Sequence, residues 1–282
     1  MPTQAISYAT ANIVSTEKKG AAFTINIPVK VTTELTNDGK ILITKKELKK
    51  IAEKTLLLLK HKEYGLKIKI KNEIPDGLGR EEATSLALTF SIAGEIAKKY
   101  GSINELKIDK FLSEQFLIIE KKFFDKKKLL ELCIKENEKL KFEKLATSFY
   151  GGFSVTDNSK REILRRGDIE ELFLKLHKLR VRKQLKIFES ELEKAWDEAL
   201  KGNLYTAMKI NALLLNENSK KFVKNEVIAI SYSPPYLIEI SREKKYGISS
   251  INSPTKILEK PMRIYKVKDF LKIENSDEFN IF

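Results

Sequence analysis

A strand, a short glycine-containing loop and an apolar helix follow one another between residues 64 and 97, and this succession constrains the fold more than any other feature. Residues 64–71 alternate apolar and charged side chains, as a half-buried strand does. The loop at 72–79 contains two glycines, and small or apolar side chains then recur at helical spacing: Ala83, Leu86, Ala87, Phe90, Ala93 and Ala97. Because the first amide groups of a helix lack internal partners, the sequence predicts an anion site at this junction.

Strand and helix patterns alternate along the remaining chain and predict an α+β fold. Thr44 and Glu47 form a capping box before a helix that ends near residue 61. Further helices are expected at residues 108–120, 125–138, 189–200 and 205–215, and strands at 21–33, 41–43, 153–157, 227–231, 237–240 and 263–267. Residues 147–152 interrupt the helical pattern, so we expect two lobes, residues 1–145 and 146–282.

The charge balance favours an anionic partner. The 282 residues include 53 Lys or Arg and 39 Asp or Glu, a net charge of +14. The basic residues are mostly scattered lysines, with no aromatic residues in a register that would stack bases, so a solvated surface is favoured over nucleic-acid binding. A single cysteine, no Cys/His set with zinc spacing and no bilayer-length apolar segment favour a cytoplasmic protein without a membrane partner. Cys133 and Trp196 are expected in the core, and His61 and His177 at the surface.

Three segments resemble the GHMP kinases, and one of them resembles the archaeal type of shikimate kinase within that superfamily. Residues 146–166, ATSFYGGFSVTDNSKREILRR, resemble that branch's T-A-S-x-F-G-G-x-x-V-T-D-N segment and the basic strand after it. Residues 72–85, NEIPDGLGREEATS, resemble the superfamily's P-x-x-x-G-L-G-S-S-A-A phosphate loop, and residues 12–23, NIVSTEKKGAAF, resemble N-A-I-A-T-G-K-G-S-A-F. The resemblance covers the whole chain in order.

Residues 72–85 and a further segment near the C-terminus, residues 231–236, depart from the superfamily's pattern. Arg80, Glu81 and Glu82 stand where the superfamily has small hydroxyl residues, and two carboxylates there would repel a triphosphate unless they point away or hold Mg²⁺. Residues 231–236, SYSPPY, replace the glycine turn S-G-x-G-P-S. Tyr232 and Pro234 do not readily adopt a positive φ, so this turn is expected to differ in shape. A P-loop is excluded, since Gly39-Lys40 lacks the rest of that motif.

The resemblance implies a two-lobed α+β GHMP kinase fold with mixed sheets and layered helices. It also implies ATP-dependent phosphorylation of the 3-hydroxyl of shikimate in aromatic amino-acid biosynthesis, with ATP and Mg²⁺ as cofactors. The implied nucleotide-binding residues are Pro75, Asp76, Gly77, Leu78, Gly79, Arg80, Glu81, Glu82, Ala83, Thr84 and Ser85. The implied acceptor-binding residues are Lys19, Asn158, Arg161 and Arg165, with Arg166 as a further candidate.

Glu143 and Asp157 are the candidate catalytic residues. Glu143 lies eight residues before the Gly151-Gly152 pair, where the family has an active-site acid, and the resemblance implies a role as metal ligand or hydroxyl-orienting base. Lys144 replaces the neighbouring acid or amide. The alternatives are a solvated helix-end carboxylate for Glu143 and a hairpin turn for Asp157.

Two other functions remain open from the sequence. The first is a GHMP kinase for another hydroxyl substrate such as homoserine. The second is a catalytically degenerate homologue with a binding or regulatory role, which the altered phosphate loop favours. The oligomeric state is open as well.

Overall fold

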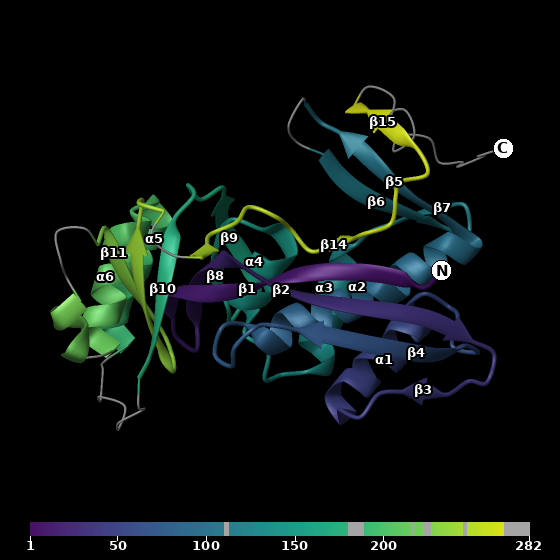
Figure 1. The fold of residues 1–282 in the computed structure, drawn as a ribbon, viewed down its shortest axis with the longest axis horizontal. Helices are drawn as coiled ribbons and strands as arrows, with labels where there is room; N and C mark the ends of the chain where they lie inside the picture. The colour runs from purple at the N-terminus through teal and green to yellow at the C-terminus, as the bar shows by residue number, and fades with distance from the viewer. Residues whose placement is uncertain (110–112, 180–188, 216, 223–226, 245–246, 268–282) are drawn as a thin grey trace.

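Two long antiparallel strands run through the middle of the protein (Figure 1). The structure is a computed structural model that describes residues 1–109, 113–179, 189–215, 217–222, 227–244 and 247–267. The strands of the large sheet are β1 (Thr3–Ser15), β2 (Lys19–Thr36), β3 (Ile41–Leu42), β4 (Gly65–Asn72), β8 (Phe153–Asp157), β9 (Glu162–Gly167) and β14 (Lys256–Ile257). Their order is β14–β1–β2–β4–β3, with β8 on the remaining part of β2 and β9 beside β8. The sheet therefore takes strands from both sides of residue 145, and the division into two lobes there stays a prediction.

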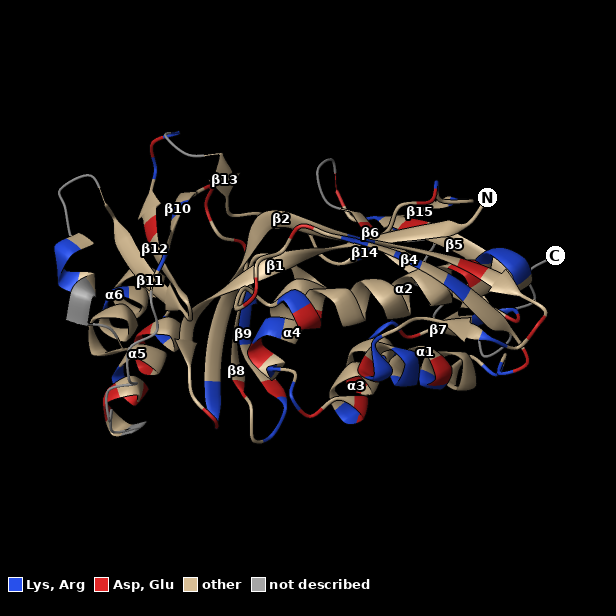
Figure 2. Cartoon of the chain, turned by 60° about the horizontal axis from the view of Figure 1, so that its bottom comes forward, with Lys and Arg blue, Asp and Glu red and all other residues tan. Residues whose placement is uncertain are grey.

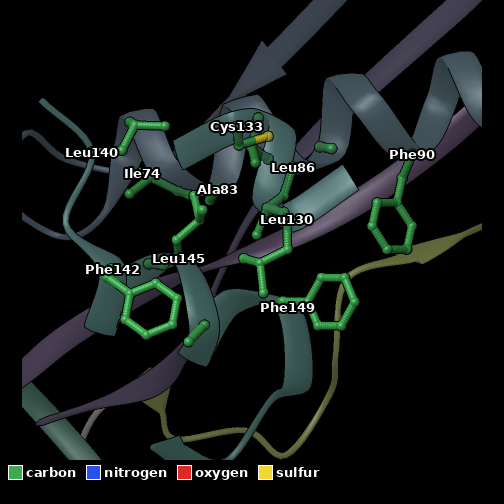
Figure 3. Close-up of a cluster of buried hydrophobic side chains, with 14 of the residues drawn as sticks. Ile74, Ala83, Leu86, Phe90, Leu130, Cys133, Leu140, Phe142, Leu145 and Phe149 are labelled. Carbon is green, nitrogen blue, oxygen red and sulfur yellow. The ribbon is translucent and has the colours of Figure 1, made fainter. Parts of the chain in front are cut away.

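Four helices pack around one another beside β1 and β2. They are α1 (Lys46–Leu58), α2 (Arg80–Tyr100), α3 (Lys127–Glu136) and α4 (Phe142–Tyr150). Helix α2 contacts both long strands and each of the other three helices, and its residues are buried without interruption from Glu82 to Gly94. Figure 3 shows the apolar cluster in which Phe90 meets Phe149 edge to face, with ring centroids 5.7 Å apart. The middle of α2 is thereby packed against the last turn of α4.

Two smaller sheets lie at opposite ends of the long strands (Figure 1). One has the order β11 (Ala229–Ser233), β12 (Tyr236–Ser241), β10 (Phe173–Lys178) and β13 (Ile248–Ser249), with helices α5 (Glu189–Lys201) and α6 (Leu204–Leu215) and the 3-10 helix η1 (Glu217–Phe222) beside it. The other has the order β15 (Ile264–Lys266), β5 (Gly101–Lys107), β6 (Ser113–Ile119) and β7 (Lys122–Phe124). No helix among these described residues is both long and apolar enough to cross a bilayer.

The helix expected at residues 108–120 is wrong. Residues 113–119 form β6, which pairs with β5 from Lys107↔Ser113 to Gly101↔Ile119, and residues 110–112 lie outside the described chain. The strand buries four consecutive apolar residues, Phe116 to Ile119, on the two sides of a sheet, and such a run has no period that separates strand from helix. Backbone pairing with β5 therefore decides that these residues form a strand and not a helix.

Two local predictions about helix ends are also wrong. Helix α4 continues through Thr147, whose hydroxyl donates to the Glu143 carbonyl at 2.6 Å, and ends before Gly151. The capping box at Thr44 does not form, because Lys45 occupies the N-cap position and no side chain caps α1.

The predictions that Cys133 and Trp196 lie in the core are confirmed, and the prediction that His61 lies at the surface is wrong. Cys133 and Trp196 are buried, and burial raises the pKa of the Cys133 thiol to about 12. His61 is buried too, because the turn after α1 folds back and stacks its ring on Tyr100 with centroids 4.3 Å apart. His177 is half-buried in β10 beside Glu239.

Truncating the Phe90 side chain tests this packing. Because Phe90 is only 2% exposed in the cluster that joins α2 to α4, Phe90→Ala should lower the free energy of unfolding by about 3–5 kcal/mol. Leu57→Ala, at a side chain of α1 that is 52% exposed, should change it by no more than about 0.5 kcal/mol. Urea unfolding of both variants measures the difference, and equal effects would contradict this description of the core.

Candidate active site

The loop between β4 and α2 is held from both of its ends. Asn72 accepts a hydrogen bond from the Ile74 amide at 2.9 Å and donates one to the Thr84 hydroxyl at 2.8 Å. The Leu78 carbonyl accepts from the Thr10 amide of β1 at 2.9 Å, and the Leu78 side chain is fully buried. These contacts fix the loop against the first turn of α2 and against β1.

Gly79 is the N-cap residue of α2, and the first backbone amides of the helix are left without intrahelical partners. Gly79 has φ +69°, and a Cβ there would overlap the Thr10 hydroxyl, so only glycine fits. No side chain caps the helix, and the Thr10 hydroxyl is buried without a hydrogen-bond partner among the described residues. Free helix amides beside an unpartnered buried hydroxyl form a suitable cradle for an anion.

The β11–β12 hairpin closes over the other glycine of the loop. A Cβ on Gly77 would overlap the carbonyl of Pro234, which forms a two-residue turn with Pro235 through a cis peptide bond. The Ser233 hydroxyl accepts a hydrogen bond from the backbone N–H of Asn12 at 2.6 Å, and the Ser231 hydroxyl donates to the backbone carbonyl of Asn12. Strand β1, the glycine loop and this C-terminal hairpin therefore meet at one place, although they are far apart in the sequence.

Glu143 is a fully buried carboxylate in the first turn of α4. One oxygen accepts from the Ser15 hydroxyl at 2.8 Å and the other from the Asn158 amide at 3.0 Å. Asn158 is held in turn by the Thr156 hydroxyl at 2.7 Å. Gly20 makes room for the carboxylate, since a Cβ there would lie 2.7 Å from the Cβ of Glu143. The solvated-helix-end alternative for Glu143 is therefore wrong.

Burial controls the protonation of Glu143. Removal from water raises the pKa of Glu143 above its ordinary value, while the hydrogen bond from Ser15 opposes that shift. The positive charge of Lys144 also lowers this pKa, and the negative charge of Glu82 raises it. The carboxylate is thus poised to bind a proton more readily than an exposed glutamate.

The start of α4 is attached by one polar contact to the first turn of α2 and by another to the glycine loop. The buried Glu82 carboxylate accepts from the Lys141 amide at 3.0 Å, and the Lys144 ammonium donates to the Gly77 carbonyl at 2.9 Å. Glu81 is exposed, so of the two acidic residues in the first turn of α2 only Glu82 is turned into the structure. Figure 2 shows charged residues on both helices where α2 and α4 come together.

A cleft of about 550 Å³ opens beside the first turn of α2, a size typical of sites for small molecules. Its walls combine apolar and polar side chains, and the hydroxyl of Ser85, one of the lining residues, is buried without a partner among the described residues. The lining residues are Ile43, Thr44, Lys45, Glu47, Leu48, Ile70, Asn72, Arg80, Glu81, Thr84, Ser85, Asn137 and Lys139.

Other residues expected at the site lie at its edge or elsewhere. Asp157 accepts from the Ser159 hydroxyl at 2.6 Å, which is the main cause that lowers its pKa, and from the Lys160 amide at 3.1 Å. These are contacts of the β8–β9 turn, and Asp157 is not hydrogen-bonded to Glu143. Of the pair at residues 157 and 158, only Asn158 contacts Glu143.

The basic acceptor candidates are spread along the β8–β9 and α5 side. The Lys19 ammonium lies 4.4 Å from the Trp196 ring centroid and 3.1 Å from Glu193. Arg165 donates to the Leu200 carbonyl in the last turn of α5 at 2.9 Å. Arg161 is exposed in the turn, and Arg166 lies over the Tyr150 ring. Their acceptor-binding roles, like that of Asp157 in catalysis, stay predictions.

Sequence reasoning missed Thr10 and Ser15. Thr10 lies outside the three resembling segments, and Ser15 lies within residues 12–23 at a position to which the resemblance assigns no role. Ser15 pairs with Gly20 in the β1–β2 register, so a sequence-based prediction of that register would have placed it beside Gly20. The structure also brings Lys144 to the glycine loop, a contact that its helical position alone does not reveal.

No known family model matches the sequence, but solved structures share its fold. Mevalonate kinase from Methanococcus jannaschii superposes with a TM-score of 0.59 at 12% identity, covering 89% of this chain and 98% of that one. Mevalonate-3-kinase from Thermoplasma acidophilum, solved with mevalonate 3-phosphate and ADP, gives 0.56 at 8% identity, with 92% and 99% covered. A protein assigned as homoserine kinase from Listeria monocytogenes gives 0.58 at 13% identity, with 92% and 100% covered.

Identities this low establish the fold alone. The chain has the α+β fold of the GHMP kinases, with mixed sheets and layered helices, as the sequence predicted.

Replacing Glu143 by Gln should change how stability depends on pH. Because burial raises the pKa of Glu143 in the folded protein, the unfolded chain loses this proton first as pH rises, and wild-type stability falls until the folded carboxyl also ionises. Glu143→Gln has no such proton. The variant's stability relative to wild type should therefore grow as the pH rises above 4.5, the ordinary pKa of a glutamate, measured by urea unfolding without metal. A difference that is the same at every pH would contradict the burial-raised pKa.

Proposed function

We propose that this protein transfers the γ-phosphoryl group of ATP to a hydroxyl group of a small molecule. The observation that carries the proposal is the meeting of an uncapped helix start with a buried, hydrogen-bonded carboxylate. The Lys144–Gly77 hydrogen bond and the Glu82–Lys141 hydrogen bond link the two features directly. Phosphoryl transfer needs little covalent chemistry from the protein, but it needs bound phosphates, neutralised charge and an aligned hydroxyl.

The residues at the start of α2 fit the phosphates of ATP. The amides of its first turn and the unpartnered Thr10 hydroxyl supply donors, and Gly79 leaves the backbone open to close approach. The cleft of about 550 Å³ shares Arg80, Glu81, Thr84 and Ser85 with the expected nucleotide-binding set. Its apolar wall would take the nucleoside while the phosphates lie at the helix start.

The buried carboxylates fit Mg²⁺. This ion is usually bound through one or two carboxylates together with substrate phosphates, and it keeps several waters. Glu143 and Glu82 are the buried carboxylates beside the glycine loop, and they would hold the ion. The described residues hold no cluster of three or more His, Cys, Asp or Glu, which a phosphate-dependent Mg²⁺ site does not require. When bound, the metal neutralises phosphate charge.

If Glu82 alone holds the ion, Glu143 would accept the proton of the attacking hydroxyl. Ser15 and Asn158 fix the orientation of both carboxylate oxygens, so little reorganisation is needed when substrate binds. A raised pKa makes the carboxylate a better proton acceptor, because general-base catalysis is most effective when the pKa of the base approaches the working pH.

We propose shikimate as the acceptor, phosphorylated at its 3-hydroxyl in aromatic amino-acid biosynthesis. The support is the resemblance of residues 146–166, which includes Asn158, the amide that holds Glu143. Lys19, Arg161 and Arg165 are the candidates for the acceptor's carboxylate. A coupled assay with ATP and shikimate, run beside homoserine and mevalonate, tests this choice. Turnover only with another hydroxyl acceptor would replace shikimate while keeping the kinase.

A second candidate function is nucleotide binding without turnover. It is favoured by the Pro234 carbonyl, which covers Gly77, and by Arg80, Glu81 and Glu82 in the first turn of α2. Calorimetry of ATP binding separates the two functions: binding with no turnover on any of the three acceptors selects this alternative.

A matched pair of charge-removing variants tests the role of Glu143. Glu143→Gln should lower kcat by roughly 10²- to 10⁴-fold with ATP, Mg²⁺ and acceptor saturating, as expected for a positioned base. Asp157→Asn removes the same charge from the β8–β9 turn, and its effect should fall on the KM of the acceptor. Full kcat in Glu143→Gln would overturn the assignment and make Asp157 the better candidate.

A further inference from the structure

Lys144 is a charged side chain that the fold buries inside the candidate site. The residue is only 9% exposed, and it follows Glu143 on α4. Its ammonium donates to the Gly77 carbonyl at 2.9 Å. Among the described residues this is the single hydrogen bond of the ammonium, and no ion pair joins it to a carboxylate. An ammonium carries three donors, and buried charges are normally paired, so the protein alone leaves Lys144 incompletely satisfied.

The surroundings of Lys144 indicate what would complete its contacts. Gly77 belongs to the same loop as Gly79, where α2 begins with uncapped amides. The Pro234 carbonyl packs directly against Gly77, so the loop has no room to move toward the β11–β12 hairpin. The ammonium and the helix start are both positive, and they lie at two points of one short loop. An anion bound there would satisfy both.

The charge of the neighbouring residues explains why a cation is needed at this position. Glu81 and Glu82 place two carboxylates in the first turn of α2, and they oppose a bound polyphosphate. Glu82 is buried and uses an oxygen to hold the Lys141 amide, so it stays near the helix start. Lys144 is the buried cation that offsets this negative charge. Its effect on Glu143, whose pKa it lowers, shows that its charge acts within the site.

We propose that Lys144 is a phosphate-binding residue, whose ammonium binds the terminal phosphate of a nucleoside triphosphate while it holds the Gly77 loop in place. This inference rests on the proposed function, because it takes ATP as the ligand of the site. A charge-assisted hydrogen bond in a desolvated site is stronger than a neutral one, so the contact contributes to affinity for the phosphates and not for the nucleoside. Lys144 thereby compensates for the hydroxyl residues that Arg80, Glu81 and Glu82 replace.

Three variants and four ligands test the proposal by calorimetry. Lys144→Met should weaken ATP binding by about 10- to 100-fold, the loss expected for one hydrogen bond to a charged group, and should leave adenosine binding within about twofold. ADP should lose less than ATP. Lys144→Arg keeps the charge and should retain most of the ATP affinity. Lys135→Met removes an exposed charge from α3, outside the site, and should bind every ligand as wild type does.

Several outcomes would overturn the proposal. Unchanged ATP binding in Lys144→Met would show that the ammonium does not reach the phosphates. If Lys144→Met loses the same affinity for ATP as for adenosine, Lys144 only supports the Gly77 loop. Thermal unfolding of Lys144→Arg checks that this variant keeps the fold.

Inorganic tripolyphosphate separates this proposal from the proposed function. Suppose that wild type binds tripolyphosphate, that Lys144→Met does not, and that wild type does not bind ATP. The phosphate-binding role of Lys144 is then supported, and the proposed kinase activity is contradicted. If wild type phosphorylates an acceptor with ATP and Lys144→Met binds ATP equally well, the proposed kinase activity is supported and the phosphate-binding role of Lys144 is contradicted. Binding of neither ligand by wild type overturns both.

Discussion

The carboxylate of Glu143 joins three segments that are distant in the sequence. Its oxygens bind the Ser15 hydroxyl at the end of β1 and the Asn158 amide after β8, while its own backbone starts α4. Gly20 on β2 is the residue that allows this helix to approach the sheet so closely. A buried carboxylate without such donors would be strongly unfavourable, so these hydrogen bonds are a condition for placing α4, and with it the glycine loop, where they lie.

The same arrangement concentrates opposite charges around one loop. Glu82 and Glu143 supply buried negative charge, and Lys144 with the amides of α2 supplies positive charge. Two hydrogen bonds between a side chain and the backbone hold these charged groups in place: the Lys141 amide donates to Glu82, and the Lys144 ammonium donates to the Gly77 carbonyl. Arg80, Glu81, Glu82 and Lys144, the departures from the resembling pattern, therefore lie on the two helices that meet at this loop, and the charge of Lys144 is opposite to those of Glu81 and Glu82.

Local rules made part of this site predictable from the sequence. The strand, glycine loop and helix at residues 64–97 follow from periodicity and from the needs of helix ends, and Glu143 and Asn158 follow from a resembling segment. The contacts of Thr10 and Ser15 could not be predicted, because they depend on how β1 sits against the loop and against α4. Strand β6 was missed for a similar reason: its pairing with β5, where Gly101 lies directly against the Ile118 carbonyl, decides between strand and helix. Asp157 and Asn158 are adjacent in one motif, yet the turn after β8 separates their surroundings.

A crystal structure of the protein with Mg²⁺ and a non-hydrolysable ATP analogue tests the central claim most directly. The account predicts phosphates at the first amides of α2, between Gly79 and the start of α4, with the nucleoside in the cleft beside Thr84 and Ser85. Phosphates bound at any other place on the chain, with this loop empty at saturating analogue, would contradict it.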